Sequence, residues 1–225
     1  MRVRHNKDAE NLLLQYPNLY IDDCEQKHGK WKWFYNNNHL LKLEIGCGKG
    51  QFIINQALKY PQYDFIAIEK DATILLKAVR QAQSIVDQGY VINNLKFTLG
   101  DAKNIEFIFD DNEVDEIFLN FSDPWPKKHH TKRRLTSPFF LKQYYLILKP
   151  NGKIILKTDN ALFFAYSMQT IKDDPHWTVE YETNDLYQEI DLEINKENIK
   201  TEYEEKFIAQ NVSIHKAVIK TNKQY

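Results

Sequence analysis

From residue 39 onward, short apolar runs alternate with longer amphipathic segments along the chain. The runs have the length and composition of buried strands, and the segments between them show the i, i+3, i+4 apolar spacing of helices. This pattern predicts an α/β fold with a mainly parallel sheet and right-handed crossovers, in which ligands bind at the carboxyl ends of the strands. The predicted strands are 39–46, 63–69, 95–100, 115–122 and 152–159, and the predicted helices are 50–61, 71–89, 137–152 and 161–174.

Two further apolar runs, 176–183 and 211–221, have no clear crossover helix directly between them. We expect them to close the sheet as an antiparallel pair. The predicted architecture is therefore a doubly wound, Rossmann-like sheet, mostly parallel with an antiparallel C-terminal strand. Helix-end signals agree with it: Asp71 is the expected N-cap of one helix, Gly89 lies near its end, and Pro138 falls in the first turn of another.

The length of 225 residues suits one domain with a small appendage. We expect an N-terminal arm at 1–38, with helical spacing around Leu12–Leu14, and one domain at 39–225. No apolar run reaches the roughly 18 residues of a transmembrane helix, so no membrane partner is expected. The N-terminus is charged and is interrupted by Pro17, unlike a signal peptide.

Metal-binding patterns are missing from the sequence. Cys24 and Cys47 form no CxxC pair, which favours a reducing, cytoplasmic setting. His129 and His130 are adjacent, lack the spacing of helical metal ligands, and have no acidic or cysteine partner nearby. We therefore predict no metal site.

Charge is unevenly distributed, although the formal net charge is only −1. Residues 127–134 (KKHHTKRR) hold five Lys or Arg and no acid, whereas residues 180–205 hold ten acids against two lysines, a formal charge of −8. A basic run can be a solvated surface. Five cations at the mouth of a ligand cleft, in an otherwise acidic protein, favour contact with phosphates of a nucleic acid instead.

A glycine-rich turn follows the first predicted strand, in the segment Glu44-Ile45-Gly46-Cys47-Gly48-Lys49-Gly50. Glycines allow a sharp turn after a strand and the approach of a ligand to the backbone. A purely structural turn before a helix would look similar, so the glycines alone leave the function open. Glu69 ends the second strand, where a carboxylate can accept hydrogen bonds from ribose hydroxyls, and Asp101 follows the third, placed to meet the adenine edge.

Two nucleotide cofactors fit such a site, NAD and S-adenosylmethionine. The glycine pattern is GxGxG rather than the GxGxxG of many NAD sites, because residue 51 is Gln51. Glu44 would repel a pyrophosphate but could bind a cationic methionine moiety. The balance favours S-adenosylmethionine.

The fourth predicted strand leads into Ser122-Asp123-Pro124-Trp125-Pro126, beside the expected reactive end of the cofactor. The prolines restrict the backbone, Trp125 offers a face for a base, and Asp123 can accept hydrogen bonds from base donors. The plainer interpretation is a rigid turn with a packed Trp and a self-capping Asp. On the same edge, Asp159 is a candidate N-cap, and Thr201 with Glu204 is a candidate capping box.

These motifs, in this order, resemble the bacterial tRNA (guanine-N7-)-methyltransferase family, from about Lys30 through the last strand. The resemblance implies an S-adenosylmethionine-dependent methyltransferase domain at 39–225, acting on N7 of the guanosine at position 46 in the tRNA variable loop to give 7-methylguanosine. It implies Asp123 as catalytic residue, with cofactor contacts at Glu44, Gly46, Gly48, Glu69, Asp101 and Asp123. It implies tRNA or guanosine contacts at Lys127, His129, His130, Thr131, Lys132, Arg133, Arg134, Asp159, Thr201, Glu202, Tyr203 and Glu204.

Two rival functions stay open at this point. An amino-group methyltransferase acting on adenine or cytosine also carries a short Pro-aromatic motif after the fourth strand. A non-catalytic RNA-binding protein could retain the same fold, although the presence of Glu44, Glu69 and Asp123 together argues against it. The sequence allows a monomer or a homodimer.

Overall fold

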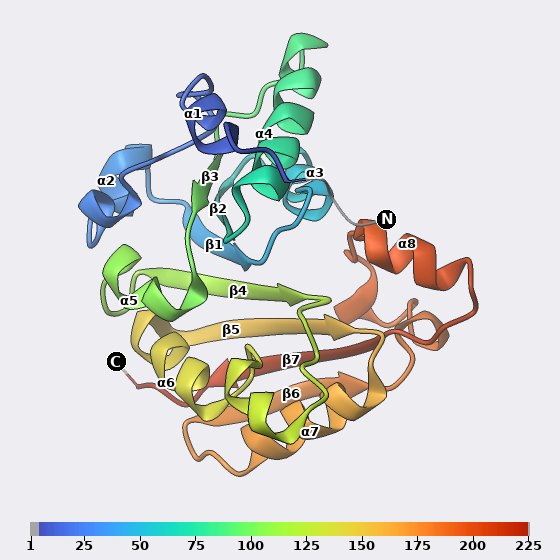
Figure 1. Cartoon of the computed structure of the whole chain (residues 1–225). Coiled ribbons are helices and arrows are strands. Elements are labelled where there is room, and N and C mark those ends of the chain that lie inside the picture. The colour runs from blue at the N-terminus through green and yellow to red at the C-terminus, as the bar shows by residue number, and fades with distance from the viewer. Residues whose placement is uncertain (1–4, 225) are drawn as a thin grey trace.

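The computed structural model describes residues 5–224, which form a seven-stranded sheet with helices on both faces (Figure 1). The sheet order is β3-β2-β1-β4-β5-β7-β6, and β7 runs antiparallel to both of its neighbours while the other pairs are parallel. The predicted mostly parallel sheet with an antiparallel C-terminal strand is confirmed. The strands are β1 (Leu40–Ile45), β2 (Tyr63–Glu69), β3 (Leu95–Leu99), β4 (Val114–Asn120), β5 (Leu148–Thr158), β6 (Trp177–Thr183) and β7 (His215–Thr221).

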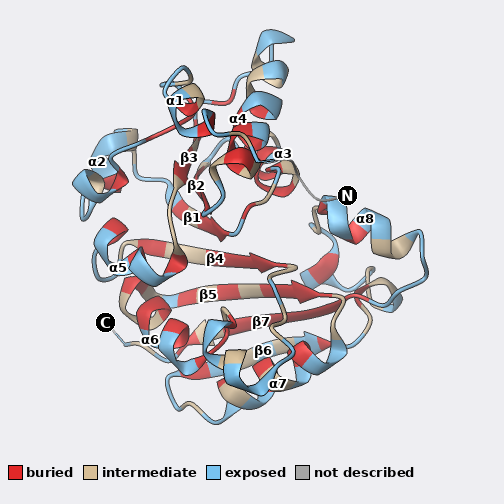
Figure 2. Cartoon of the chain, in the orientation of Figure 1, coloured by how far each residue is buried: buried red, intermediate tan, exposed pale blue. Residues whose placement is uncertain are grey.

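Helices cover both faces of this sheet, with α1, α3 and α4 on one side and α5, α6 and α7 on the other (Figure 1). Side chains along β2 alternate between two apolar cores: Phe65 packs with α3 and α4, and Ile66 packs with α5 and α6. Figure 2 shows the strands largely buried and the outer helix faces exposed. The helices are α1 (Ala9–Leu13), α2 (Trp31–Tyr35), α3 (Gln51–Lys59), α4 (Ala72–Asp87), α5 (Ile105–Ile108), α6 (Pro138–Ile147), α7 (Ala161–Lys172) and α8 (Glu202–Ile208), with 3-10 turns η1 (Cys24–Lys27), η2 (Ala102–Asn104), η3 (Lys128–Arg133), η4 (Leu186–Gln188) and η5 (Glu193–Asn195).

The predicted helix 137–152 is wrong at its C-terminal end. Helix α6 stops at Ile147, and the next residues already belong to β5. Pro150 has no N–H to continue the helix, and Asn151 turns the chain with a φ of 63°. The pairing of β5 with β4 shifts register across this irregularity.

The N-cap predictions have mixed outcomes. The Asp71 carboxylate accepts hydrogen bonds from the Thr73 and Ile74 amides at 2.9 and 3.1 Å, so it caps α4 as predicted. Asp159 is not the N-cap of α7. The neighbouring Asn160 takes that position and accepts from the Phe163 amide at 2.8 Å. Sequence alone could not separate two adjacent residues that are both good caps.

The N-terminal segment packs against the edge of the sheet. The Ile21 amide donates to the Phe97 carbonyl at 2.9 Å, and the Phe97 amide donates to the Leu19 carbonyl at 2.7 Å, so this segment covers edge strand β3. Trp31 is fully buried, and its indole N–H donates to the Ile108 carbonyl at 2.8 Å. Within residues 5–224, no helix has the length and apolarity needed to cross a membrane.

The acidic segment 180–205 is not a uniformly solvated surface. Several of its carboxylates pair with lysines on the sheet, on its covering helices and in the glycine turn after β1, which offsets much of the segment's negative charge. The pairs are Glu180 with Lys153 and Lys220, Glu182 with Lys172, Glu197 with Lys59, Glu202 with Lys49, and Glu204 with Lys157.

Candidate active site

A cavity of about 540 Å³ opens at the carboxyl ends of β1, β2 and β4. Its walls come from the glycine turn after β1, the end of β2, the loop after β3, the loop after β4, and the start of α8. Crossover connections on opposite sides of the sheet leave a crevice here, which is where doubly wound sheets bind ligands. The structure thus brings together Glu44, Gly46, Gly48, Glu69, Asp101, Asp123, Arg133, Thr201, Glu202 and Tyr203 from the residues predicted by sequence.

The glycine turn has a conformation that other residues would strain. Gly48 has a φ of 57° in the turn, and Gly50 has a φ of 82° at the start of α3. A Cβ on Gly50 would also lie 2.9 Å from the Ala78 Cβ, so this position needs glycine for close packing of the turn on α4. The glycines therefore leave backbone open to the cavity, between Cys47 and Lys49 of the same turn, which also line it.

Glu69 holds this turn in place. One carboxylate oxygen accepts a hydrogen bond from the Gly48 amide at 3.2 Å, and the other accepts from the amides of Lys70 and Asp71 at 2.8 and 3.0 Å. Burial raises the pKa of the Glu69 carboxyl, and these hydrogen bonds counteract that rise. Glu69 thus connects the end of β2 to the glycine turn, a structural contact that its sequence position did not reveal.

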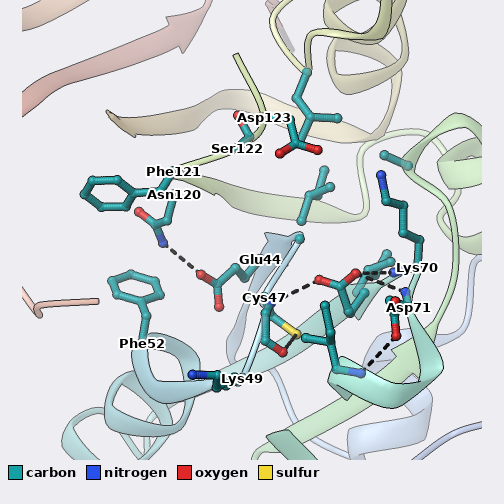
Figure 3. Close-up of a pocket in the computed structure, with 18 of the residues that line it drawn as sticks. Glu44, Cys47, Lys49, Phe52, Lys70, Asp71, Asn120, Phe121, Ser122 and Asp123 are labelled. Carbon is teal, nitrogen blue, oxygen red and sulfur yellow. Dashed lines mark hydrogen bonds between the residues drawn. The ribbon is translucent and has the colours of Figure 1, made fainter. Parts of the chain in front are cut away.

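Glu44 lies on the inner wall with only 2% of its surface exposed. The Asn120 side-chain amide donates to one of its oxygens at 2.9 Å (Figure 3). The other carboxylate oxygen and the Asn120 amide oxygen are buried and have no hydrogen-bond partner among the described residues. Burial raises the pKa of Glu44 to about 8, although the Asn120 hydrogen bond and the Lys157 charge act against this rise. Two unpartnered acceptors at one wall suit a ligand that brings several N–H donors, such as a primary ammonium.

The loop after β4 forms the opposite wall, so that Asp123 faces Glu44 and the glycine turn across the cavity (Figure 3). Phe121 and Trp125 have positive φ values of 50° and 41°, which are strained for aromatic residues. The Asp123 carboxylate is exposed to the cavity, and the Ser122 hydroxyl is buried without a partner among residues 5–224. This loop therefore offers the Asp123 carboxylate to a substrate.

Asp101 has a structural contact as well as a place in the cavity wall. Its carboxylate accepts a hydrogen bond from the Lys103 amide at 3.0 Å and so caps the short turn η2. One carboxylate oxygen forms this bond, which leaves the other oxygen for an adenine amino group.

The basic run forms the 3-10 turn η3 beside the cavity, and its members do not behave alike. Lys127, Lys128 and Lys132 are exposed, and none of them lines the cavity. Arg133 does line it, with its guanidinium 5.0 Å from the centre of the Trp125 ring. Arg134 is buried. His129, His130 and Thr131 lie outside the cavity wall, and the His130 ring packs edge-on against Trp125.

The last wall is the start of α8, where the predicted capping box of Thr201 and Glu204 is confirmed. Glu204 is fully buried and forms an ion pair with Lys157 of β5 at 2.6 Å. Burial acts to raise the pKa of Glu204, but Lys157 and hydrogen bonds from Tyr187 and Asn198 outweigh it and hold that pKa below its usual value. The Glu204 carboxylate thus anchors α8, and its buried position leaves Thr201, Glu202 and Tyr203 on the cavity side.

Sequence reasoning missed several residues of this site. Asn120 precedes the Asp123 loop at the end of β4, and only its polar type at a strand end hinted at a role. Lys157 sits in an apolar strand, which marks it as unusual without naming its partner. Asp159, predicted as a guanosine contact, lies at the end of β5 outside the cavity wall.

Known proteins place this chain in a family. A family model described as "Putative methyltransferase" matches residues 38–217. A tRNA (guanine-N(7)-)-methyltransferase of Oenococcus oeni is 45% identical over 94% of this chain and 95% of its own length, and one of Malacoplasma penetrans is 40% identical over 98% of both. The solved 16S rRNA methyltransferase KamB superposes with a TM-score of 0.58 at 15% identity, over 98% of this chain and 95% of that chain, a likeness of fold alone. The chain belongs to the tRNA (guanine-N(7)-)-methyltransferase family.

Proposed function

We propose that this protein transfers the methyl group of S-adenosylmethionine to N7 of a guanosine in tRNA, at position 46 of the variable loop, giving 7-methylguanosine. The observation that carries the proposal is the cavity itself. Its inner wall holds the unpartnered acceptors of Glu44 and Asn120, and Asp123 faces them across the cavity. Membership of a tRNA (guanine-N(7)-)-methyltransferase family supports the same activity.

The residues of the cavity fit the parts of this cofactor. Glu44 and Asn120 would accept hydrogen bonds from the methionine ammonium, and Glu69 with Asp101 would meet the ribose and adenine. When bound, S-adenosylmethionine supplies an electrophilic methyl group on a sulfonium. The backbone of the glycine turn lets it approach closely, because no side chain stands in the way at Gly46 or Gly48.

The protein's task in this reaction is positioning. Guanine N7 carries a free lone pair, so no general base has to remove a proton before the methyl is transferred. Asp123 would orient the guanine through its N1–H and amino group, and its charge would lie near the sulfonium. Alignment of reacting groups can supply up to roughly 7–11 kcal/mol. A duplex hides N7 in a deep, narrow groove, so we expect the target to be a loop nucleotide drawn out of its stack.

The direct test is incubation of the protein with unmodified tRNA and methyl-labelled S-adenosylmethionine, followed by digestion to nucleosides. We expect the label in 7-methylguanosine. Label in an N-methylated adenosine or cytidine would replace the proposal by the amino-group alternative. Binding of tRNA without any methylated nucleoside would favour the non-catalytic alternative.

The Glu44→Gln variant is expected to bind S-adenosylmethionine roughly ten- to a hundredfold more weakly, since hydrogen bonds to charged groups contribute about 1.5–3 kcal/mol. It should also be more stable than the wild type at alkaline pH. The raised pKa of about 8 means that folded Glu44 holds its proton where the unfolded chain has released it. Stability of the wild type therefore falls as pH rises from about 4.3 to about 8, and glutamine abolishes that loss.

Calorimetric titration and thermal melts at pH 6 and pH 9 measure both effects. The matched control is Glu106→Gln on α5, which makes the same exchange at an exposed glutamate outside the cavity wall. If Glu44→Gln has the cofactor affinity of the wild type and the same pH dependence of Tm, Glu44 is not part of the proposed site.

Replacement of Lys127, Lys128 and Lys132 together by alanine is expected to flatten the salt dependence of tRNA affinity. Each lysine–phosphate interaction contributes about 0.7–0.9 to the log–log slope, so removal of three such interactions reduces the slope by about two to three. These three lysines are chosen because they are exposed, whereas the two arginines of the run pack against protein groups.

The control variant replaces Lys32, Lys77 and Arg80, three exposed cations on α2 and α4, and should leave the slope unchanged. Affinity for S-adenosylmethionine should stay constant in both variants. Parallel salt lines for the wild type and the 127/128/132 variant would show that these lysines are only a solvated surface.

A further inference from the structure

Arg134 differs from every other cation of the basic run by being buried, with only 9% of its surface exposed. We propose that Arg134 is a positioning residue, which holds the Asp123 loop in its working shape and makes no contact with RNA. The expected effect on turnover rests on the proposed methyl transfer. The contacts of Arg134 described below do not depend on that function.

The guanidinium of Arg134 is engaged on its edge and on its face. Nε donates to the Pro124 carbonyl at 2.9 Å, and one terminal nitrogen donates to the Trp125 carbonyl at 3.1 Å. The planar group also lies 4.2 Å from the centre of the Tyr166 ring on α7. Within the described residues it has no carboxylate partner, so the two carbonyls and the aromatic face take up its charge.

The Asp123 loop needs such an external hold. Pro124 and Pro126 lack backbone N–H groups, so they cannot donate hydrogen bonds that would fasten the loop to its surroundings. Trp125 between them has a φ of 41°, a conformation that persists only where neighbouring groups enforce it. Arg134 thus clamps two consecutive peptides of the loop, Pro124–Trp125 and Trp125–Pro126, through their carbonyl oxygens, and Arg133 covers the Trp125 ring.

The consequence falls on Asp123, the residue directly before the clamped peptides. Relaxation of those peptides would displace the Asp123 carboxylate relative to the opposite wall of the cavity. In-line transfer is sensitive to such displacement, and a shift of about 1 Å can cost on the order of a hundredfold in rate. A residue with this task should influence turnover rather than the affinity for tRNA.

The Arg134→Lys variant separates the two roles, because lysine retains the charge and loses the planar fork. We expect kcat for tRNA methylation to fall at least about tenfold, with the Kd for tRNA and its salt slope as in the wild type. A phosphate contact gives the reverse pattern: Arg134→Lys would remain close to the wild type, and Arg134→Ala would flatten the salt slope by about 0.7–0.9. That second pattern would overturn the proposal.

Hydrogen exchange provides a readout that does not depend on catalysis. In Arg134→Lys, amides of the 121–127 loop should lose protection while those of β4 and β5 retain it. Tyr166→Leu, which removes the aromatic face beneath the guanidinium, should reduce kcat in the same direction with tRNA affinity unchanged. The control is Arg80→Ala, which removes an exposed arginine of α4 and should change none of these measurements.

The experiments distinguish an error in the proposed role of Arg134, which is to clamp the Asp123 loop, from an error in the proposed function. A wild-type protein that makes no 7-methylguanosine contradicts the proposed function, while the exchange and tRNA-binding measurements still test the clamp. Wild-type turnover and wild-type loop protection in Arg134→Lys would contradict the clamp, whatever the product of the reaction.

Discussion

The Asp123→Ala variant is expected to lose at least about a hundredfold in turnover of tRNA, corresponding to ~2.7 kcal/mol of transition-state stabilisation. Asp123 faces the cavity opposite Glu44, and its carboxylate forms no hydrogen bond with any described residue. Its contribution should therefore go to the substrate and to the charge on the cofactor, with little effect on the fold. Tm should stay within a few degrees of the wild type.

Single-turnover methylation with saturating tRNA and cofactor measures this effect without interference from product release. Asp123→Asn is the matched control, since the amide preserves size and one acceptor oxygen but removes the charge. A rate for Asp123→Asn between those of the wild type and Asp123→Ala would show that both hydrogen bonding and charge contribute to the effect of Asp123. If turnover of Asp123→Ala stays within about threefold of wild type, roughly 0.7 kcal/mol, Asp123 is only a turn residue.

The Lys157→Met variant is expected to reduce the free energy of unfolding by about 3–5 kcal/mol. Lys157 and Glu204 are both buried and meet at 2.6 Å, and the Lys157 ammonium also donates to the Asn198 side chain and the Ile199 carbonyl. Methionine fills a similar volume but leaves the Glu204 carboxylate buried without its counter-ion. The anchor between β5 and α8 is then removed, together with the cavity wall that α8 carries.

Urea denaturation of the wild type, Lys157→Met, Glu204→Gln and the double variant measures this pair as a double-mutant cycle. The double variant should recover a large part of the loss, because no unpaired charge remains buried. Lys172→Met is the control, since its partner Glu182 forms an exposed pair that should contribute less than about 1 kcal/mol. A loss of similar size in Lys157→Met and Lys172→Met would contradict the anchoring role.

The local features of this fold could be predicted from sequence because they depend on neighbours along the chain. The apolar periodicity located β1 to β5, and the Asp71 cap located the start of α4. The Thr201–Glu204 capping box needs only two residues three positions apart. Where two local signals competed, as at Asp159 and Asn160, the prediction was wrong because either side chain can reach the helix amides.

The glycine turn, Glu69, Asp101 and Asp123 could also be predicted as neighbours, because the carboxyl ends of parallel strands lie at one edge of a sheet. This rule predicts which strand ends lie close together, but it does not predict which side chains are in contact there. The sequence by itself thus determined the fold class, the edge of the sheet that carries the cavity, and the motifs that resemble the methyltransferase family.

Only the tertiary structure decided which polar groups are paired. Glu44 meets Asn120, a residue 76 positions away, and leaves two acceptors free in the cavity. Lys157 binds Glu204, so a residue of the acidic segment became an anchor. Arg134 is buried beneath a loop while the adjacent Arg133 stays exposed. Burial and pairing depend on the packing of elements distant in sequence, and the same charged residue is solvated or structural according to what that packing places beside it.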